Sequence, residues 1–235
     1  FFYTPKPPYQ ILSGLVGSEM CIRDSVKEAC LTGINHIETA PAYGTAETLL
    51  GNTLKMLNSE GCRPEGGWVI TSKILPGTDL NKGKDQLQGI LSRLGISKIH
   101  NLAIHGLNLQ EHLEWALNGE GSKLIEWAEQ KRLIGQVGFS SHGTFTLIKK
   151  AIESRRFQFC SLHLHLLDQE RIPLAKMALE RKLGVMAISP ADKGGHLHTH
   201  RSDALVQINS RMHREILSAR GIGNQVFALH LAHWR

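Results

Sequence analysis

Hydrophobic and polar positions follow two alternating periods along most of the chain. Short apolar runs start at residues 36, 68, 99, 134, 159 and 184, and each precedes a polar loop and then a stretch with apolar residues at helical spacing. The runs begin about 25 to 35 residues apart, which is the length of one strand–helix unit. The pattern therefore predicts repeated βα units whose right-handed connections keep the strands parallel.

The periodicity assigns most of the chain to definite elements. Strands are expected at residues 36–40, 68–74, 99–105, 134–139, 159–166 and 184–189. Helices are expected at residues 46–57, 84–94, 123–131, 145–154, 173–182, 212–219 and 226–234, with the end of an earlier helix at 26–31 and an irregular region at 108–121. Six such units without a glycine-rich nucleotide fingerprint after the first strand favour an α/β fold of the (β/α)8 TIM-barrel type over a doubly wound sheet.

The length and the two ends limit how much of a barrel this sequence holds. A complete (β/α)8 barrel needs about 250 residues, and the chain has 235. We expect a barrel truncated at both ends that contains about strands two to seven, with an eighth strand following Arg235. Residues 1–25 show neither period and are expected to be non-native or disordered, so the partial barrel is assigned to residues 26–235.

Composition narrows the class of protein without identifying a function. The chain is 41% hydrophobic and 20% charged, with a net charge of +6, and no run of five Lys or Arg marks a nucleic-acid track. No apolar run approaches the roughly 18 residues that cross a bilayer. Four cysteines without a C-x-x-C pair argue against a disulfide framework or zinc knuckle and favour a reducing compartment. We therefore expect a cytoplasmic protein that acts on a small molecule, without nucleic-acid or membrane partners, and the oligomeric state stays open.

Four reactive side chains fall at the ends of three successive predicted strands. Glu38 and Tyr43 follow the first strand, Lys73 lies near the end of the second and His105 ends the third. The carboxyl ends of parallel strands meet on one rim of a barrel, where ligands bind. We therefore expect these four side chains to lie together.

These four residue types are suited to delivering a proton to a carbonyl oxygen. An unperturbed tyrosine has a pKa near 10, and a neighbouring Lys73 ammonium would lower the pKa of Tyr43. Glu38 would keep the lysine charged and oriented, and His105 could hydrogen-bond the substrate oxygen. Singly, Tyr43 could be a packing aromatic, Lys73 a solvent-reaching lysine and His105 a loop histidine, but four such groups on one rim favour the chemical interpretation.

The same segments resemble the aldo/keto reductases. The resemblance is carried by HIETAPAYGTAETLLG (36–51), ITSK (70–73), LAIHG (102–106) and IGQVGFSSHG (134–143), in this order and spacing. It implies a (β/α)8 barrel that reduces an aldehyde or ketone with NADPH, or less often NADH. On this resemblance Tyr43 is the general acid, Lys73 lowers its pKa, Glu38 stands where the family usually has Asp, and His105 orients the substrate.

The resemblance is less complete on the cofactor side. Ser140, Ser141 and Ser161 lie where family members usually place the residues that hold the nicotinamide amide, and an isoleucine replaces the usual stacking tyrosine. The loop that includes Ser189, Lys193 and Gly194 is the expected approach to the pyrophosphate, because glycines there let backbone N–H groups come close. The family's main adenosine-phosphate contacts follow strand eight, so the chain alone is expected to be inactive.

A narrower resemblance points to a subgroup within the family. The segments GFSSHG (138–143) and ISPADKGG (188–195) are similar to aldo/keto reductases that carry a C-terminal ferredoxin-like 4Fe-4S extension. No cluster-binding cysteine motif is present, so such a cluster would belong to sequence beyond residue 235.

Two alternative hypotheses stay open, of which one rests on the histidines. The chain has 13 histidines, of which His163 and His165 share one face of a predicted strand and His196, His198 and His200 share a loop. A TIM-barrel metal-dependent hydrolase would use such ligands, although no matching aspartate is evident and we predict no metal. A non-catalytic, reductase-like nucleotide-binding scaffold is the other alternative.

Overall fold

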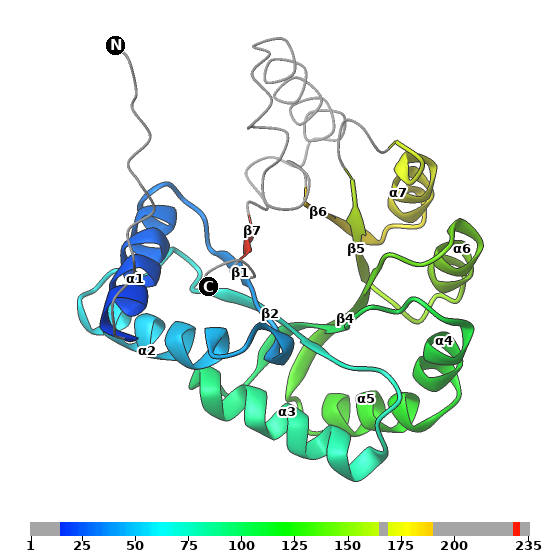
Figure 1. Cartoon of the computed structure of the whole chain (residues 1–235), viewed down its shortest axis with the longest axis horizontal. Helices are drawn as coiled ribbons and strands as arrows, with labels where there is room; N and C mark the ends of the chain where they lie inside the picture. Colours follow the sequence, from blue (N-terminus) through cyan, green and yellow to red (C-terminus); the bar gives the residue numbers. More distant parts are fainter. Residues whose placement is uncertain (1–14, 165–168, 190–227, 231–235) are drawn as a thin grey trace.

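The fold is a curled parallel sheet with helices along its outer side (Figure 1). The computed structural model describes residues 15–164, 169–189 and 228–230. The strands are β1 (His36–Glu38), β2 (Val69–Ile74), β3 (Ile99–Ile104), β4 (Ile134–Ser141), β5 (Phe159–His163), β6 (Gly184–Ile188) and β7 (Ala228–His230). All neighbouring pairs are parallel, in the order β6-β5-β4-β3-β2-β1-β7. The described residues therefore form a half-barrel, as the repeated βα pattern predicts.

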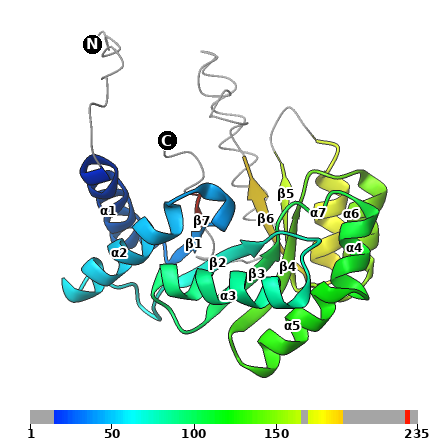
Figure 2. The same ribbon diagram turned by 60° about the horizontal axis from the view of Figure 1, so that its bottom comes forward.

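The helices follow the strands in chain order and lie outside them. They are α1 (Leu15–Leu31), α2 (Ala46–Ser59), α3 (Leu80–Leu94), α4 (Gln110–Leu117), α5 (Glu120–Gln130), α6 (Phe145–Glu153) and α7 (Ile172–Glu180), with a short 3-10 helix, η1 (Pro41–Tyr43). Figure 2 shows the strands side by side with α3 and α5 beneath them and α1 against α2 at one end. None of the described helices is both long and apolar enough to cross a membrane.

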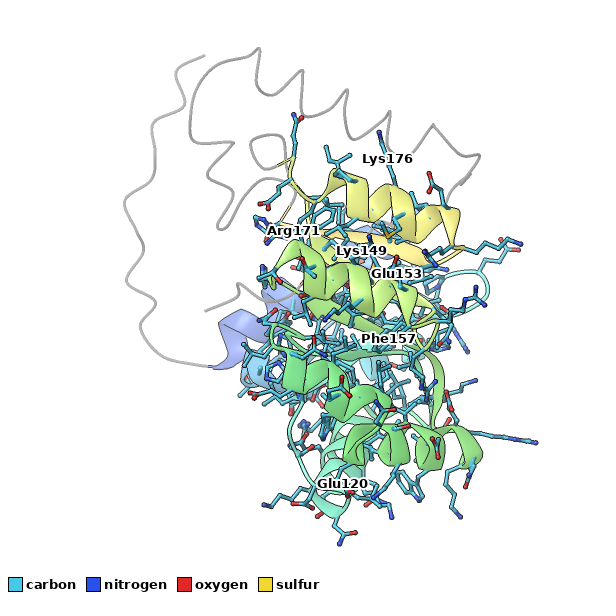
Figure 3. All side chains as sticks on the ribbon, turned by 90° about the vertical axis from the view of Figure 1, so that its right-hand side faces the viewer. Glu120, Lys149, Glu153, Phe157, Arg171 and Lys176 are labelled. Carbon is cyan, nitrogen blue, oxygen red and sulfur yellow. The ribbon has the colours of Figure 1, made fainter. Side chains whose placement is uncertain are left out.

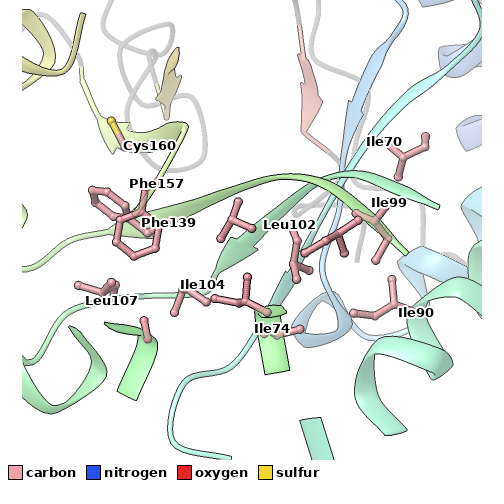
Figure 4. Close-up of a cluster of buried hydrophobic side chains, with 14 of the residues drawn as sticks. Ile70, Ile74, Ile90, Ile99, Leu102, Ile104, Leu107, Phe139, Phe157 and Cys160 are labelled. Carbon is pink, nitrogen blue, oxygen red and sulfur yellow. The ribbon is translucent and has the colours of Figure 1, made fainter. Parts of the chain in front are cut away.

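The hydrophobic core lies between the sheet and the helices. On β2, β3 and β4 alternate residues point outward, and Ile70, Leu102 and Phe139 are at most 1% exposed. Helix residues such as Ile90 on α3 pack against them (Figure 4). The other set of alternate residues faces the inside of the curled sheet. Because the core is built on the outer side, the inner side can carry polar groups.

The polar inner face begins one layer below the rim. The Nε2 atom of His36 lies 2.6 Å from the Thr71 hydroxyl, and the Asn101 amide donates to the same hydroxyl at 3.0 Å. These residues come from β1, β2 and β3, respectively. Together they satisfy buried polar atoms that an apolar interior would leave without partners.

Three predicted segments differ from the structure. Residues 15–25, for which no regular structure was expected, form the first part of α1, where Ile22 and Val26 enter the core. The region 108–121 is not irregular, because it contains α4. The helix predicted at 226–234 is also wrong in its centre: Ala228–His230 pairs with β1 as strand β7. The predicted helix at 212–219 lies outside the described residues.

Candidate active site

Lys73 is the centre of a buried polar group at the carboxyl ends of β1 and β2. Its ammonium Nζ lies 2.7 Å from Oε1 of Glu38, and the two side chains are 2% and 1% exposed. Nζ also donates to the Tyr43 hydroxyl at 2.8 Å and to the Thr39 carbonyl at 3.4 Å. The three residues predicted to act together are therefore in direct contact, and the glutamate side chain reaches the lysine.

The sequence after β1 places Tyr43 over this ion pair. Pro41 occupies the first turn of η1, where its missing N–H needs no acceptor. Gly44 follows with φ +65°, a conformation that glycine adopts without strain, and α2 begins at Ala46. This short turn brings the Tyr43 ring back over β2, with Lys73 Nζ 4.6 Å from the ring centroid.

His105 completes the group from the next strand. It directly follows β3, and its backbone N–H donates to the Ile74 carbonyl at 2.7 Å. Its ring lies edge-to-face with that of Tyr43, with centroids 5.7 Å apart and planes at 88°. Lys73 and His105 line a pocket of about 370 Å³ together with η1 and α3 residues. Of the four predicted residues, Lys73 and His105 thus line this pocket, and Glu38 and Tyr43 contact Lys73.

Burial determines the protonation of Tyr43. Removal from water raises the pKa of Tyr43 above its ordinary value, and the Lys73 ammonium opposes that rise through its charge and its hydrogen bond. The predicted lowering by Lys73 has the expected sign but is smaller than the effect of burial. Tyr43 is therefore a neutral phenol at neutral pH, which is the protonation state that a proton donor requires.

The residues predicted to bind a cofactor divide into two kinds. Ser140 and Ser161 are register partners on β4 and β5, and both lie on the inner face. Ser141 faces the other way: its hydroxyl donates to the Leu107 carbonyl at 2.6 Å and accepts from Gly143 N–H at 3.0 Å, so it fixes the loop after β3. Ser189 follows β6, whereas Lys193 and Gly194 lie outside the described residues.

Ser161 has the clearest unmet hydrogen-bonding capacity on the inner face. It is 0% exposed, and its hydroxyl has no hydrogen-bond partner within the described part of the chain. The Ser140 hydroxyl, by contrast, accepts from Gly106 N–H at 3.0 Å. A buried hydroxyl without a partner costs free energy, and an amide group bound beside it would supply one.

The sequence pattern did not predict an ion pair on the outer side of β2 in which the carboxylate, but not its arginine partner, is buried. Glu47 is 0% exposed and accepts from Arg93 on α3 and from Ser72, the residue before Lys73. The available signal was the position of Glu47 on the apolar stripe of the predicted helix 46–57, since a buried charged residue needs a partner. Its partner could not be identified before α2 and α3 were placed side by side.

The histidine alternative gains no support from the described residues. His163 and His142 lie with ring centroids 5.6 Å apart, but no group of three or more His, Cys, Asp or Glu within the described ranges is placed to hold a metal ion. His165, His196, His198 and His200 lie outside those ranges.

A second hollow lies beyond the end of β4. Its volume is about 490 Å³, and it is lined by the first turn of α6 and by Arg171, whose guanidinium donates to the Gly143 carbonyl at 3.4 Å. Figure 3 shows Arg171 on this side of the molecule, at the start of α7. None of Glu38, Tyr43, Lys73 and His105 lines this hollow.

Several solved structures share this fold. PA4992 from Pseudomonas aeruginosa, which is classed with the aldo-keto reductases, has a TM-score of 0.69 and 21% identity, over 92% of this chain and 79% of that one. The Bombyx mori aldo-keto reductase in complex with NADP has a TM-score of 0.67 and 19% identity, over 97% and 77%. A Klebsiella pneumoniae aldo/keto reductase with NADP and acetate has a TM-score of 0.66 and 18% identity, over 86% and 70%.

Sequence comparison assigns the family directly. The model of the aldo/keto reductase family matches residues 19–220, which is most of the chain. Curated protein sequences gave no match. The match includes every residue of the candidate active site and all six strands from β1 to β6. The chain therefore belongs to the aldo/keto reductase family, a family of oxidoreductases.

Proposed function

We propose that this chain carries the site of an NADPH-dependent oxidoreductase that reduces an aldehyde or ketone, with Tyr43 as the proton donor. The observation that carries the proposal is the position of Lys73 Nζ, 2.7 Å from the Glu38 carboxylate and 2.8 Å from the Tyr43 hydroxyl. Family membership and the NADP complexes of the Bombyx mori and Klebsiella pneumoniae structures support it.

The chain's own residues would deliver the proton in one step. Because Lys73 donates to the Tyr43 oxygen, the hydroxyl hydrogen points away from Lys73. Tyr43 transfers this proton to the carbonyl oxygen as negative charge develops there, and the Lys73 ammonium stabilises the phenolate that remains. Glu38 pairs with Lys73 and holds its ammonium beside the Tyr43 hydroxyl. His105, whose ring contacts Tyr43, donates a hydrogen bond that orients the carbonyl.

The inner-face serines fit a nicotinamide. Ser161 offers a buried hydroxyl with no partner in the described residues, and Ser140 lies beside it on β4. We propose that these two hydroxyls hold the amide, and that Ser189, Lys193 and Gly194 approach the pyrophosphate. When bound, the nicotinamide supplies the hydride for the carbonyl carbon. Ser141 is assigned a structural role instead, because its hydroxyl is already used by two backbone groups.

The test measures alcohol production by the purified chain with nitrobenzaldehyde and NADPH over long incubations. The chain alone is expected to be inactive at the rate of a typical enzyme, roughly 10 s⁻¹, so the assay looks for residual turnover far below that rate. Tyr43→Phe should lower the rate at least about a hundredfold, whereas Tyr9→Phe, the same chemical change elsewhere, should not. NADH in place of NADPH tests the cofactor preference.

Three outcomes would contradict the proposal. Alcohol production that survives Tyr43→Phe would exclude Tyr43 as the acid. Ester hydrolysis that appears only with added zinc would favour the metal-dependent hydrolase. NADPH binding without any alcohol above the protein-free blank would favour the non-catalytic scaffold. The 4Fe-4S subgroup stays a prediction.

A further inference from the structure

The outer side of β2 carries a buried charged group that the proposed mechanism does not use. The carboxylate of Glu47 is completely buried. One oxygen, Oε1, accepts from the Ser72 hydroxyl at 2.7 Å. The other, Oε2, accepts from both Nε and a terminal nitrogen of Arg93 at 2.8 Å. Both carboxylate oxygens are therefore engaged by side chains from two other elements.

The Glu47–Ser72 hydrogen bond connects the η1–α2 segment to β2 on the outer side of the sheet, and the Tyr43–Lys73 hydrogen bond connects them on the inner side. Glu47 lies in the first turn of α2, four residues after Tyr43, and Ser72 is the residue before Lys73. Adjacent strand residues face opposite sides, so Ser72 bonds Glu47 on the outer side while Lys73 bonds Tyr43 on the inner side. The segment from η1 to α2 is thus attached to β2 at two points.

Close packing of α2 on α3 makes the outer attachment possible. Gly51 lies one helical turn after Glu47, and a Cβ atom at Gly51 would lie 2.2 Å from the Arg93 carbonyl oxygen. Glycine therefore lets the two helices approach until the Arg93 side chain reaches Glu47. Arg93 also lines the pocket that Lys73 and His105 line. The hydrogen-bonded group of Glu47, Ser72 and Arg93 therefore borders the candidate site.

Stability alone is a weak explanation for this arrangement. Burying a carboxylate carries a desolvation penalty that its ion pair repays only with good geometry, and apolar residues of similar volume often stabilise a protein more. The charged group does add directional hydrogen bonds, because the Glu47 carboxylate accepts from Ser72 on β2 and from Arg93 on α3.

We propose that Glu47 is a positioning residue that, with Ser72 and Arg93, holds the start of α2 against β2 and so keeps the Tyr43 hydroxyl within hydrogen-bond distance of Lys73. The inference rests on the proposed function in that Tyr43 is the proton donor. The catalytic contact itself is made by Tyr43, and Glu47 acts only through the backbone that carries it.

The test measures how strongly Lys73 influences Tyr43, without cofactor or substrate. The chain is labelled at the tyrosine ring carbon that bears oxygen, and the Tyr43 signal is assigned by its loss in Tyr43→Phe. Lys73→Met should raise the titration midpoint of Tyr43 by about one pH unit, because an adjacent ammonium favours the phenolate. In the Glu47→Gln and Ser72→Ala backgrounds, Lys73→Met should raise the midpoint by less than about half of the rise in the otherwise unchanged chain.

If Lys73→Met alone does not fold, the double variant Lys73→Met with Glu38→Gln replaces it in the same comparison.

Matched variants separate positioning from simple stability. Glu153→Gln removes an exposed ion pair, at 3.3 Å, between α6 and Arg181, the residue after α7. It should leave the Lys73 effect unchanged (Figure 3). Arg93→Lys keeps the positive charge and should retain more of the Lys73 effect than Arg93→Met. Gly51→Ala keeps every charge but separates α2 from α3, and should act like Ser72→Ala.

A full-sized Lys73 effect in Ser72→Ala and Glu47→Gln, with a lowered free energy of unfolding, would overturn the inference and leave Glu47 a purely structural residue. Ser72→Ala removes one hydroxyl only, so it decides the matter even where Glu47→Gln does not fold. The titration is independent of turnover. Suppose that the chain converts no aldehyde, but Lys73→Met raises the Tyr43 titration midpoint less in the Glu47→Gln and Ser72→Ala backgrounds. That result would refute the proposed function while supporting the positioning role.

Discussion

At the scale of single residues, the candidate site depends on an ion pair that is almost fully buried. A charged group removed from water costs free energy unless it is paired. The Glu38 carboxylate lies 2.7 Å from Lys73 Nζ and supplies that partner. The pairing was predictable from Glu38 at the end of an apolar strand. The direction in which the pKa of Tyr43 shifts was not predictable. Burial raises this pKa more than Lys73 lowers it, and that burial depends on how η1 folds over the site.

Removing Lys73 alone should destabilise the fold. Lys73→Met leaves the Glu38 carboxylate buried without its cation, so we expect the free energy of unfolding to fall by about 3–5 kcal/mol. Adding Glu38→Gln should recover most of that loss, because no buried charge remains. Urea unfolding of the single and double variants measures both effects. Lys123→Met, in an exposed pair with Glu120, should leave stability nearly unchanged, and an equal loss there would contradict the explanation.

His36 should make stability depend on pH below neutrality. Burial lowers the pKa of His36 and outweighs the attraction of Glu38, so folding favours its neutral form. Below about pH 6.5, where unfolded histidine takes up a proton, the unfolded state binds more protons and stability falls as the pH decreases. His36→Gln should show a smaller decrease in urea midpoint between about pH 7 and pH 5. A parallel decrease in both proteins would assign the effect to other groups, such as His100, whose pKa burial also lowers.

At the scale of elements, the apolar runs located the strands closely, because each buried strand is bounded by polar loops. The six predicted starts agree with those of β1 to β6 to within one residue. Helix α4 was missed because its eight residues run into Asn118 and Gly119, and the next helix begins directly afterwards. Residues 228–230 were assigned to a helix because a short apolar run does not distinguish helix from strand. In the structure these residues form a strand because they pair with the edge of β1.

Two threonines at helix starts give a matched test of capping. Thr144 accepts a hydrogen bond from Leu147 N–H at the start of α6, whereas Thr45 makes no side-chain cap bond at the start of α2. Thr144→Ala should therefore lower the free energy of unfolding by about 1 kcal/mol, and Thr45→Ala should change it by less than about half of that. Chemical denaturation of the two variants checks this difference. Equal losses would show that the cap bond is not the cause.

At the scale of the whole molecule, the predictable part is the separation of a hydrophobic outer layer from a polar inner face. Period-2 strands and period-3.6 helices indicate it directly. The Glu47–Arg93 pair could not be predicted, because it depends on how closely two helices pack at Gly51. The roles of Lys193 and Gly194 stay predictions, because both residues lie outside the described part of the chain.

Cysteine reactivity should report on opening of the whole fold. Cys160 is fully buried in the outer core, and burial raises its pKa to about 12, whereas Cys30 and Cys62 are partly exposed. In native buffer, iodoacetamide should modify Cys30 and Cys62 before Cys160, and urea above the unfolding midpoint should remove the difference. Peptide mapping by mass spectrometry gives the order. Native Cys160 that reacts as fast as Cys62 would contradict the burial of this strand.

The opposite directions of Ser72 and Lys73 restrict how this gene can change in length. Deleting one codon within β2 would exchange the two faces of the strand, placing the lysine among the helices and the hydroxyl inside the curled sheet. Both the charged contact to α2 and the one to Tyr43 would be lost together. Insertions and deletions between related genes should therefore accumulate in the surface loop before β2, around Glu65 and Gly66, and be absent from Val69–Ile74.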